Sequence, residues 1–303
     1  MFKTLISKLQ EDTYLTLEIT PSHSPTISDI IEKIQKSDIV DKIDGFTCTD
    51  NPLAKLKYSS IMAALKLQLE FRKPAIATMT MRDRNKIALQ SDLLGANDFD
   101  IRAILALTGD PANMSDQPNS KGVYEANSLM LLKMIKSFNY GMDFAGRPFK
   151  TEPKQIYPFA VVNSYAKNFG SIEKKMYQKI QNGAIGVITQ PIFDIENAKK
   201  LLENFENAKE NVEGEKRKAK LIFGIFPIIK LRTALFLSAQ VPGIHVPQLW
   251  IDKLEKAHHI SEEEEYKVGM ELNKNLFKEL NKIYPKIHLM TANNRFDLVK
   301  EII

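Results

Sequence analysis

Cysteine is almost absent from this chain, which has only Cys48 among its 303 residues. A single thiol excludes an internal disulfide and a cysteine-based metal site, and it is typical of a protein in a reducing cytoplasm. No run approaches about 18 consecutive apolar residues, so we expect no membrane-spanning helix. Residues 1–20 contain no basic patch followed by an apolar run, so we expect a cytoplasmic protein without a secretory signal.

The chain also lacks a concentration of charge of one sign, although 42 basic against 37 acidic side chains give a net charge of +5. The sharpest basic run is Lys216–Lys218 with Lys220, and few aromatic residues lie near it. We interpret it as a solvated surface run, with anion binding as the alternative, and we expect no nucleic-acid partner. Internal repeats and low-complexity segments are absent as well.

What the chain does contain is a strict alternation of short apolar runs and longer amphipathic ones. The apolar runs predict buried β-strands, and apolar residues spaced by three or four predict the helices that follow them. The predicted strands are 14–20, 45–49, 74–80, 101–107, 157–163, 184–190, 221–227 and 286–291. The predicted helices after them are 27–35, 58–71, 84–94, 126–137, 171–182, 195–205, 233–239 and a short helix ending at 303.

Strand–helix pairs in this number and order are typical of a closed parallel barrel, the (β/α)8 TIM-type fold of the α/β class. We predict one catalytic domain over residues 1–303, with two extra helices, around Gln248–Ala257 and Ser261–Ile283, between strands seven and eight. An open doubly wound sheet is the alternative fold. It is disfavoured because no G-x-G-x-x-G turn follows the first strand.

Polar residues close most of the predicted strands, and in such a barrel the carboxyl ends of the strands form the catalytic face. These residues include Glu18, Thr49, Thr80, Asp110, Asn163 and Gln190. Each of them could instead cap a loop or a turn, but their convergence on one mouth favours a functional site. The two carboxylates, Glu18 and Asp110, are the candidates for acid–base chemistry.

Glu18 is the most informative of these residues because it interrupts the apolar run YLTLEIT. A carboxyl group there must be desolvated or open to a cavity, and desolvation favours the protonated form that a general acid needs near neutral pH. The alternative is a glutamate paired with a buried Lys or Arg. No histidine competes for the role or has metal-ligand spacing with a carboxylate, so we expect no metal. We expect Cys48 to be a buried structural thiol.

Four segments at the ends of strands one, two, four and six carry a resemblance to a known family. They are LEITPS around Glu18, FTCTDNP around Thr49, ILALTGDP with Asp110, and NGAIGVITQPIFD with Gln190 and Phe193. In this order and at this spacing, over nearly the whole chain, they resemble the methylenetetrahydrofolate reductase family, whose members are flavin-containing (β/α)8 barrels.

The resemblance implies reduction of 5,10-methylenetetrahydrofolate to 5-methyltetrahydrofolate, a step of one-carbon metabolism and methionine biosynthesis. NADH or NADPH would pass hydride to FAD, and the reduced flavin would pass hydride to the folate. The resemblance implies that Glu18 is the general acid, and that Asp110 stabilises the folate cation and tunes the flavin. It implies substrate-binding roles for Phe193 and for Gln190, whose amide would hydrogen-bond the pterin.

The resemblance also implies an FAD site lined by Thr49, Thr80, Gly109, Tyr124, Asn163 and Lys179. On this side the chain departs from better-known bacterial members, because Thr78 replaces a histidine, Thr108 an arginine and Asn163 a tyrosine. Two alternatives therefore stay open: a flavin-independent folate- or pterin-binding barrel, and a non-reductase partner subunit in one-carbon methyl transfer. The expected partner is the folate itself, with a homo-oligomer or an electron-delivering protein as further candidates.

Overall fold

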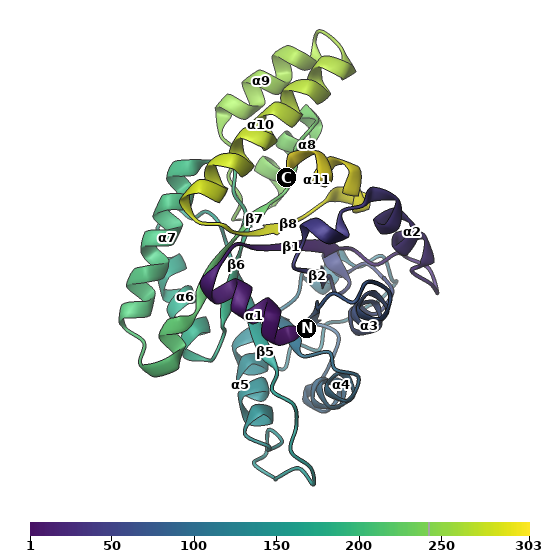
Figure 1. The fold of residues 1–303 in the computed structure, drawn as a ribbon, viewed down its shortest axis with the longest axis vertical. Coiled ribbons are helices and arrows are strands. Elements are labelled where there is room, and N and C mark those ends of the chain that lie inside the picture. Colours follow the sequence, from purple (N-terminus) through teal and green to yellow (C-terminus); the bar gives the residue numbers. More distant parts are fainter. Residues whose placement is uncertain (242) are drawn as a thin grey trace.

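The computed structural model describes residues 1–241 and 243–303, and its strands close into one parallel barrel in sequence order (Figure 1). The strands are β1 (Tyr14–Ile19), β2 (Gly45–Cys48), β3 (Ala75–Thr80), β4 (Ala103–Leu107), β5 (Tyr157–Val162), β6 (Gly186–Pro191), β7 (Lys220–Ile225) and β8 (Lys286–Leu289). Every end lies within about two residues of its predicted position. The predicted (β/α)8 fold is therefore confirmed.

The predicted helices are present as well and surround the barrel (Figure 1). They are α2 (Ser28–Ser37), α3 (Ser60–Phe71), α4 (Lys86–Asp98), α5 (Ser128–Asn139), α6 (Gly170–Gln181), α7 (Ile195–Glu210), α8 (Leu231–Gln240), α9 (Gln248–His258), α10 (Glu262–Ile283) and α11 (Phe296–Ile302). Helices α9 and α10 are the two extra helices expected between strands seven and eight.

Alternate residues of each strand face the inside of the barrel, because successive side chains of a strand point to opposite faces. The inner cluster includes Tyr14, Ile76, Leu105, Phe159, Ile188 and Ile222. Glu18 lies four residues after Tyr14, Thr80 four after Ile76, and Gln190 two after Ile188. The same alternation therefore places Glu18, Thr80 and Gln190 inside the barrel at the carboxyl ends of their strands.

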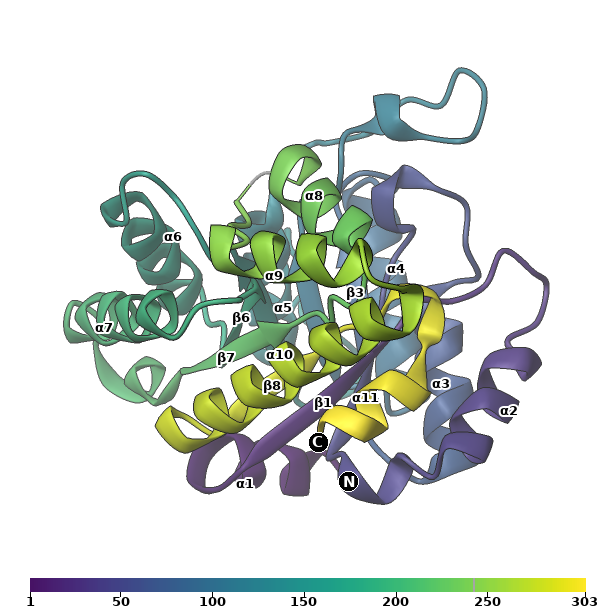
Figure 2. The same cartoon turned by 90° about the horizontal axis from the view of Figure 1, so that it is seen from above.

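Helix α1 (Phe2–Glu11) is the one α-helix in the described residues that the sequence pattern did not predict. Its apolar residues Phe2, Leu5 and Leu9 are at most 1% exposed and belong to the same cluster as the barrel interior. Figure 1 shows α1 lying across the barrel, and Figure 2 places it at the end where the strands begin. The helix thus closes the amino-terminal end of the barrel and leaves the carboxyl end as the mouth.

The mouth is bordered by helices α8 and α9, which pack against each other above α10 (Figure 2). Trp250 of α9 makes an edge-to-face contact with Phe193, with ring centroids 5.4 Å apart, so α9 is fixed to the segment that follows β6. Next along the barrel, Thr20 exchanges two backbone–side-chain hydrogen bonds with Asn294, at 3.0 and 2.8 Å. This pair joins the loops after β1 and β8.

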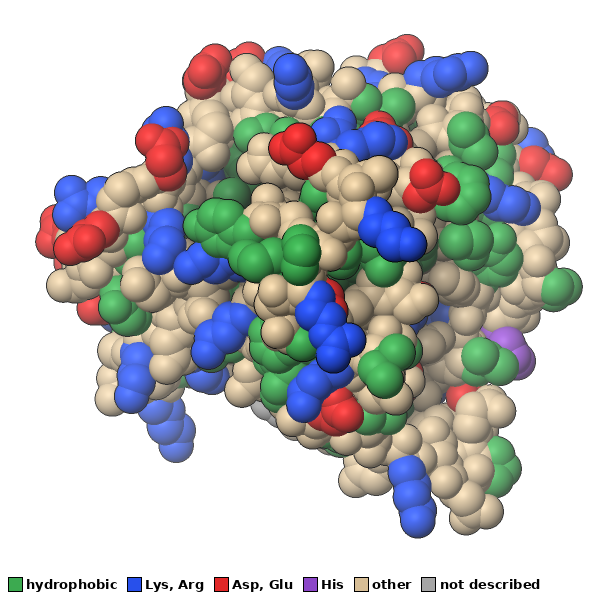
Figure 3. Space-filling view, turned by 90° about the horizontal axis from the view of Figure 1, so that it is seen from below, with side chains coloured by type: hydrophobic (Ala, Val, Ile, Leu, Met, Phe, Trp, Pro, Cys, Tyr) green, Lys and Arg blue, Asp and Glu red, His purple; other side chains and the backbone are tan. Residues whose placement is uncertain are grey.

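The surface supports the interpretation of the basic run as solvated. Side chains of both charges are interspersed with hydrophobic ones over the face drawn in Figure 3. The run lies in a short helical turn, Gly214–Lys218, where Lys218 pairs with Glu215 at 2.5 Å and Arg217 donates to the Val212 carbonyl. None of the described helices combines the length and the apolar character needed to cross a membrane.

Candidate active site

Glu18 points into the mouth of the barrel and contacts a histidine. Its side chain is 23% exposed, and its Oε2 lies 3.6 Å from Nε2 of His288 in β8. His288 is fully buried, and its Nδ1 lies 2.9 Å from the hydroxyl of Thr16. Within the described residues, no Lys or Arg lies within ion-pair distance of Glu18. The carboxyl group is therefore partly exposed and backed by a histidine, which removes the alternative of a buried Lys or Arg partner.

The sequence did not point to His288 as part of this site. Thr16 and His288 are register partners on the neighbouring strands β1 and β8, although they are far apart in the chain. His288 Nε2 is buried and has no hydrogen-bond partner among the described residues. The only available signal was the inward-facing position of a histidine on the last strand. It can be assigned to the site of Glu18 only when β8 is known to pair with β1.

Asp110 follows β4 and is held from two sides. Its carboxylate accepts a hydrogen bond of 2.6 Å from the N–H of Leu53, in the loop after β2. Its carbonyl accepts a hydrogen bond from the hydroxyl of Tyr124. Gly109 before it has φ +96°, and a Cβ there would lie 3.2 Å from Cβ of Thr80, so glycine lets the end of β4 approach the end of β3.

Thr80 and Thr49, two predicted FAD-lining residues, differ in their surroundings. Thr80 is 2% exposed, and both its N–H and its hydroxyl donate to Asp50, at 3.0 and 3.1 Å. Asp50 also pairs with Arg84 at 2.6 Å, so this hydroxyl serves a buried ion pair. The hydroxyl of Thr49 is also buried but has no partner among the described residues. Thr49 therefore keeps a free hydrogen-bonding atom.

Lys179 reaches from α6 to the first residue of α5. Its Nζ lies 3.4 Å from the hydroxyl of Ser128, and the N–H of Ser128 donates to the hydroxyl of Thr108 at 3.2 Å. Burial lowers the pKa of Lys179 to about 8, and the charge of Lys175 contributes. Within the described residues Lys179 has no acidic partner, and a cation of this kind favours a bound anion. Thr108 stands where the family resemblance expects an arginine, and here its hydroxyl accepts from the first N–H of α5.

Gln190 and Asn163 are brought together by a backbone segment between α8 and α9. A Cβ added to Gly243 would lie 2.8 Å from Oε1 of Gln190 and 2.4 Å from Nδ2 of Asn163. Both amides are half-buried. Phe193, the other predicted substrate residue, is only 3% exposed because its ring packs on Trp250. The described geometry thus places two amides at the mouth and a buried aromatic ring behind them.

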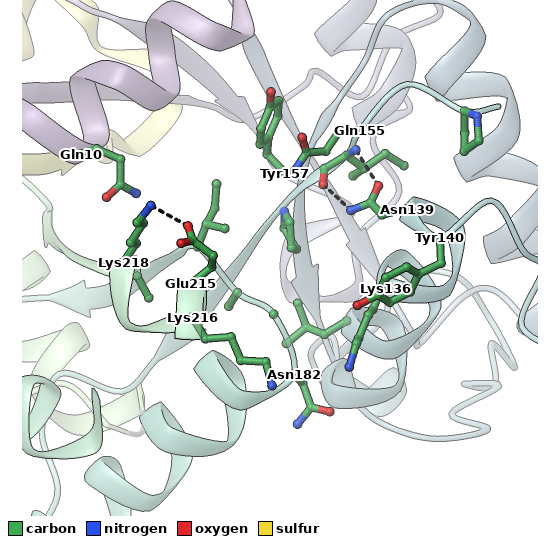
Figure 4. A pocket seen from close by; sticks show the side chains of 18 of the residues that line it. Gln10, Lys136, Asn139, Tyr140, Gln155, Tyr157, Asn182, Glu215, Lys216 and Lys218 are labelled. Carbon is green, nitrogen blue, oxygen red and sulfur yellow. Dashed lines mark hydrogen bonds and ion pairs between the residues drawn. The ribbon is translucent and has the colours of Figure 1, made fainter. Parts of the chain in front are cut away.

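The structure has a cavity at the carboxyl ends of the strands and a larger one at the amino-terminal side of the barrel. One of about 220 Å³ lies between the ends of β7 and β8 and is lined by Lys230, Arg232 and Arg295. A larger one of about 590 Å³ lies near the start of β5, among Lys136, Asn182 and the Glu215–Lys218 pair (Figure 4). The larger cavity belongs to the amino-terminal side of the barrel and shares no residue with the mouth.

Two further sequence expectations bear on the chemistry of the mouth. Cys48 is fully buried, and burial raises the pKa of its thiol, with the charge of Glu18 contributing. This confirms a structural thiol. Within residues 1–241 and 243–303, no group of three or more His, Cys, Asp and Glu side chains could hold a metal ion.

These features define a class: a closed (β/α)8 barrel whose mouth carries a glutamate–histidine pair, an aspartate and two amides. The family model of methylenetetrahydrofolate reductase matches residues 3–303, and the chain belongs to this family. No curated protein sequence matches the chain significantly.

Solved structures share the fold at low sequence identity. An uncharacterized protein from Clostridium thermocellum that binds two copies of 5-methyl-5,6,7,8-tetrahydrofolic acid is similar, with a TM-score of 0.61 and 15% identity, over 99% of this chain and 96% of that one. An F420-dependent secondary alcohol dehydrogenase, in complex with an F420-acetone adduct, has a TM-score of 0.56 and 11% identity, over 96% and 98%. DmoA from Hyphomicrobium sulfonivorans has a TM-score of 0.56 and 9% identity, over 96% and 86%.

Proposed function

We propose that this protein reduces 5,10-methylenetetrahydrofolate to 5-methyltetrahydrofolate in the cytoplasm, with hydride supplied by NADH or NADPH through FAD. The observation that carries the proposal is the Glu18–His288–Thr16 chain at the barrel mouth of a member of this family. The folate-binding structural neighbour supports the substrate class, since its ligand is the product of this reaction.

Glu18 would act as the general acid. Opening of the methylene bridge requires a proton on the departing folate nitrogen, and a partly exposed carboxyl group can deliver it. Nε2 of His288, 3.6 Å from Oε2 of Glu18, would hold the orientation of the carboxyl group toward the substrate. The hydrogen-bond contact between Thr16 and Nδ1 fixes the orientation of the imidazole ring.

Asp110 and the two amides would hold the other parts of the folate. The carboxylate of Asp110 can stabilise the cation that forms when the bridge opens, since its position is fixed by Leu53 and Tyr124. Gln190 and Asn163 each offer a donor and an acceptor to the pterin edge. Phe193 would support the substrate side by fixing α9 behind it.

The residues between β2 and α6 fit FAD, whose role when bound is to carry hydride from the nicotinamide to the folate. Lys179 suits its pyrophosphate, and the hydroxyl of Thr49, which has no partner among the described residues, offers a further hydrogen bond. Gly109 and Tyr124 would form the wall between these two points. The cavity between the ends of β7 and β8 would take a carboxylate of the folate tail at Arg232, since Lys230 and Arg295 pair with Glu262 and Asp297.

The test is formation of product. The purified protein is incubated anaerobically with FAD, 5,10-methylenetetrahydrofolate and either NADH or NADPH, and 5-methyltetrahydrofolate is measured by mass spectrometry. We expect product with at least one nicotinamide, and the preferred one is identified by its kcat/KM. Absence of product with both, in a sample that binds FAD, would contradict the proposal.

A flavin-independent folate-binding barrel is the second candidate. It is favoured by Thr80 and Thr108, because hydroxyls at two flavin-side positions already bond Asp50 and Ser128 within the protein. Such a protein would bind 5-methyltetrahydrofolate but not FAD, and it would depend on a partner protein for electrons or serve methyl transfer. Equilibrium binding of the two ligands, measured separately by calorimetry, distinguishes the two candidates.

A further inference from the structure

A buried arginine, Arg82, lies beside the predicted site and has no role in the proposed reaction so far. Its side chain is 2% exposed. Nε and Nη2 donate to the two carboxylate oxygens of Asp83, at 2.7 and 2.6 Å, and Nη2 also donates to the carbonyl of Asn51 at 3.0 Å. Nη1 has no partner among the described residues. Burial of a guanidinium group is costly, so a specific benefit is expected.

Arg82 is placed directly against the segment that carries Asp110. A Cβ on Gly109 would lie 2.9 Å from Cβ of Arg82, so the two backbones are in contact at this point. The family resemblance expects an arginine at position 108, where this chain has threonine. Arg82 therefore adjoins the same segment from the loop after β3, with its guanidinium group directed to Asp83 and Asn51.

The two groups that hydrogen-bond Asp110, the Leu53 N–H and the Tyr124 hydroxyl, belong to loops that Arg82 also contacts. The Asn51 carbonyl that Arg82 holds belongs to the loop whose Leu53 N–H binds the Asp110 carboxylate. Asn51 and Leu53 have φ of 45° and 56°, a left-handed conformation that needs outside support. On the other side, the Arg82 carbonyl accepts from Val123 at 2.7 Å, next to the tyrosine that holds the Asp110 carbonyl.

We propose that Arg82 is a positioning residue that acts through Asp110: its side chain fixes the loop after β2, and its main-chain carbonyl holds the loop that carries Tyr124. This rests on the proposed role of Asp110 in folate reduction. The charge of Asp110 in turn contributes to a raised pKa of Arg82, for which the hydrogen bond to Asp83 is the main cause.

The test is a double-mutant cycle on the rate of the folate half-reaction, followed by stopped-flow absorbance. Arg82→Met should slow this step by about 10- to 100-fold, as expected for a misplaced reacting group. Arg82→Lys should restore part of the rate, because it keeps the charge without the two-pronged contact. In an Asp110→Asn background, Arg82→Met should add no further loss. Equal fold-losses in both backgrounds would overturn the proposal.

Controls separate this proposal from instability and from failure of the proposed function. Arg102→Met removes an arginine that pairs with Asp100 at 2.9 Å near the start of β4, and it should leave the half-reaction rate unchanged. If Arg82→Met does not fold, Asp83→Asn loosens the same guanidinium group and takes its place in the cycle. If the unaltered protein reduces no folate, the proposed function fails by itself. The cycle is then measured on the affinity for 5-methyltetrahydrofolate, with the same criterion of non-additivity.

Discussion

Glu18 is the residue on which the proposed chemistry depends most. Glu18→Gln keeps the size and hydrogen-bonding capacity of the side chain but removes the proton that the folate nitrogen requires. We expect loss of folate reduction by about 10²- to 10⁴-fold, the usual contribution of a general acid. Oxidation of the nicotinamide by bound flavin should continue at the unaltered rate, because that step uses no proton from Glu18. Both half-reactions are measured by stopped-flow absorbance.

A Glu18→Gln protein that forms 5-methyltetrahydrofolate at the normal rate would remove Glu18 from the mechanism. Equal slowing of both half-reactions would instead indicate a distorted mouth. The circular dichroism spectrum and the melting temperature of the variant distinguish distortion from loss of the acid.

Lys179 should give FAD binding a pH dependence. Its pKa is lowered to about 8, so the amino group is charged below that pH and neutral above it. An anion such as the FAD pyrophosphate is attracted to the charged form only. We expect the affinity for FAD to fall by about tenfold as the pH rises through 8, since a hydrogen bond to a charged group contributes about 1.5–3 kcal/mol. Fluorescence titration of FAD over this range measures the effect.

Lys179→Met should bind FAD weakly at every pH and lose this pH dependence. Lys174→Met, on the exposed part of the same helix, is the matched control and should behave like the unaltered protein. If the two variants bind FAD with equal affinity, the pyrophosphate does not lie at Lys179.

The sequence predicted the residues of the mouth better than their contacts. Glu18, Asp110 and Gln190 could be found because strand ends and alternation are local properties of the sequence. The contact of Glu18 with His288 could not, since it depends on closure of β1 against β8. The buried ring of Phe193 has the same cause, because Trp250 comes from a helix far along the chain.

At the scale of elements, Gly243, between α8 and α9, adjoins the amides of Gln190 and Asn163. Gly243→Ala would place a methyl group 2.4 Å from Nδ2 of Asn163 and 2.8 Å from Oε1 of Gln190, and overpacking of this kind costs about 1–3 kcal/mol. We expect an affinity for 5-methyltetrahydrofolate about tenfold lower. Calorimetry measures this affinity.

Gly146→Ala is the control for this change. Gly146 has φ +85°, close to the +82° of Gly243, but a Cβ there would meet nothing within 4 Å. It carries the same backbone strain without the contact. Equal folate affinities of the two variants would show that Gly243 does not shape the substrate site.

Helix α1 should contribute stability without contributing to the reaction. Leu9 is fully buried against the barrel interior, and Leu9→Ala is expected to cost about 2–5 kcal/mol of unfolding free energy. Lys3→Ala, on the exposed face of the same helix, should cost far less. Urea unfolding gives both values. A loss for Leu9→Ala no larger than for Lys3→Ala would mean that α1 does not close the barrel.

The sequence did not predict α1 because no side-chain cap marks the start of the helix. Its amphipathic pattern was present, since Phe2, Leu5 and Leu9 have helical spacing and the outer face is polar. The strands were easier to predict, because a parallel strand that is buried on both faces is a continuous apolar run. The observed strand ends differ from the predicted ones by up to about two residues, because the residue types at the end of a strand give little indication of where the backbone changes direction.

At the scale of the whole molecule, the number and order of strands determined the architecture, and the architecture placed the site. Closure of the barrel brings Glu18, His288 and Gln190 to one mouth although three different strands carry them. Helix α1 closes the opposite end. We propose that residues 1–303 act as a single domain with one catalytic face, and that the cavity at the amino-terminal end takes no part in the reaction.

The most direct test of folate reduction through FAD is the visible spectrum of the purified protein during turnover. We predict flavin absorption bands, in the sample as isolated or after addition of FAD, that bleach with NADH or NADPH under anaerobic conditions. They should recover when 5,10-methylenetetrahydrofolate is added. Bands that bleach but do not recover with the folate would contradict the account, and so would a protein that remains colourless and inactive in the presence of excess FAD.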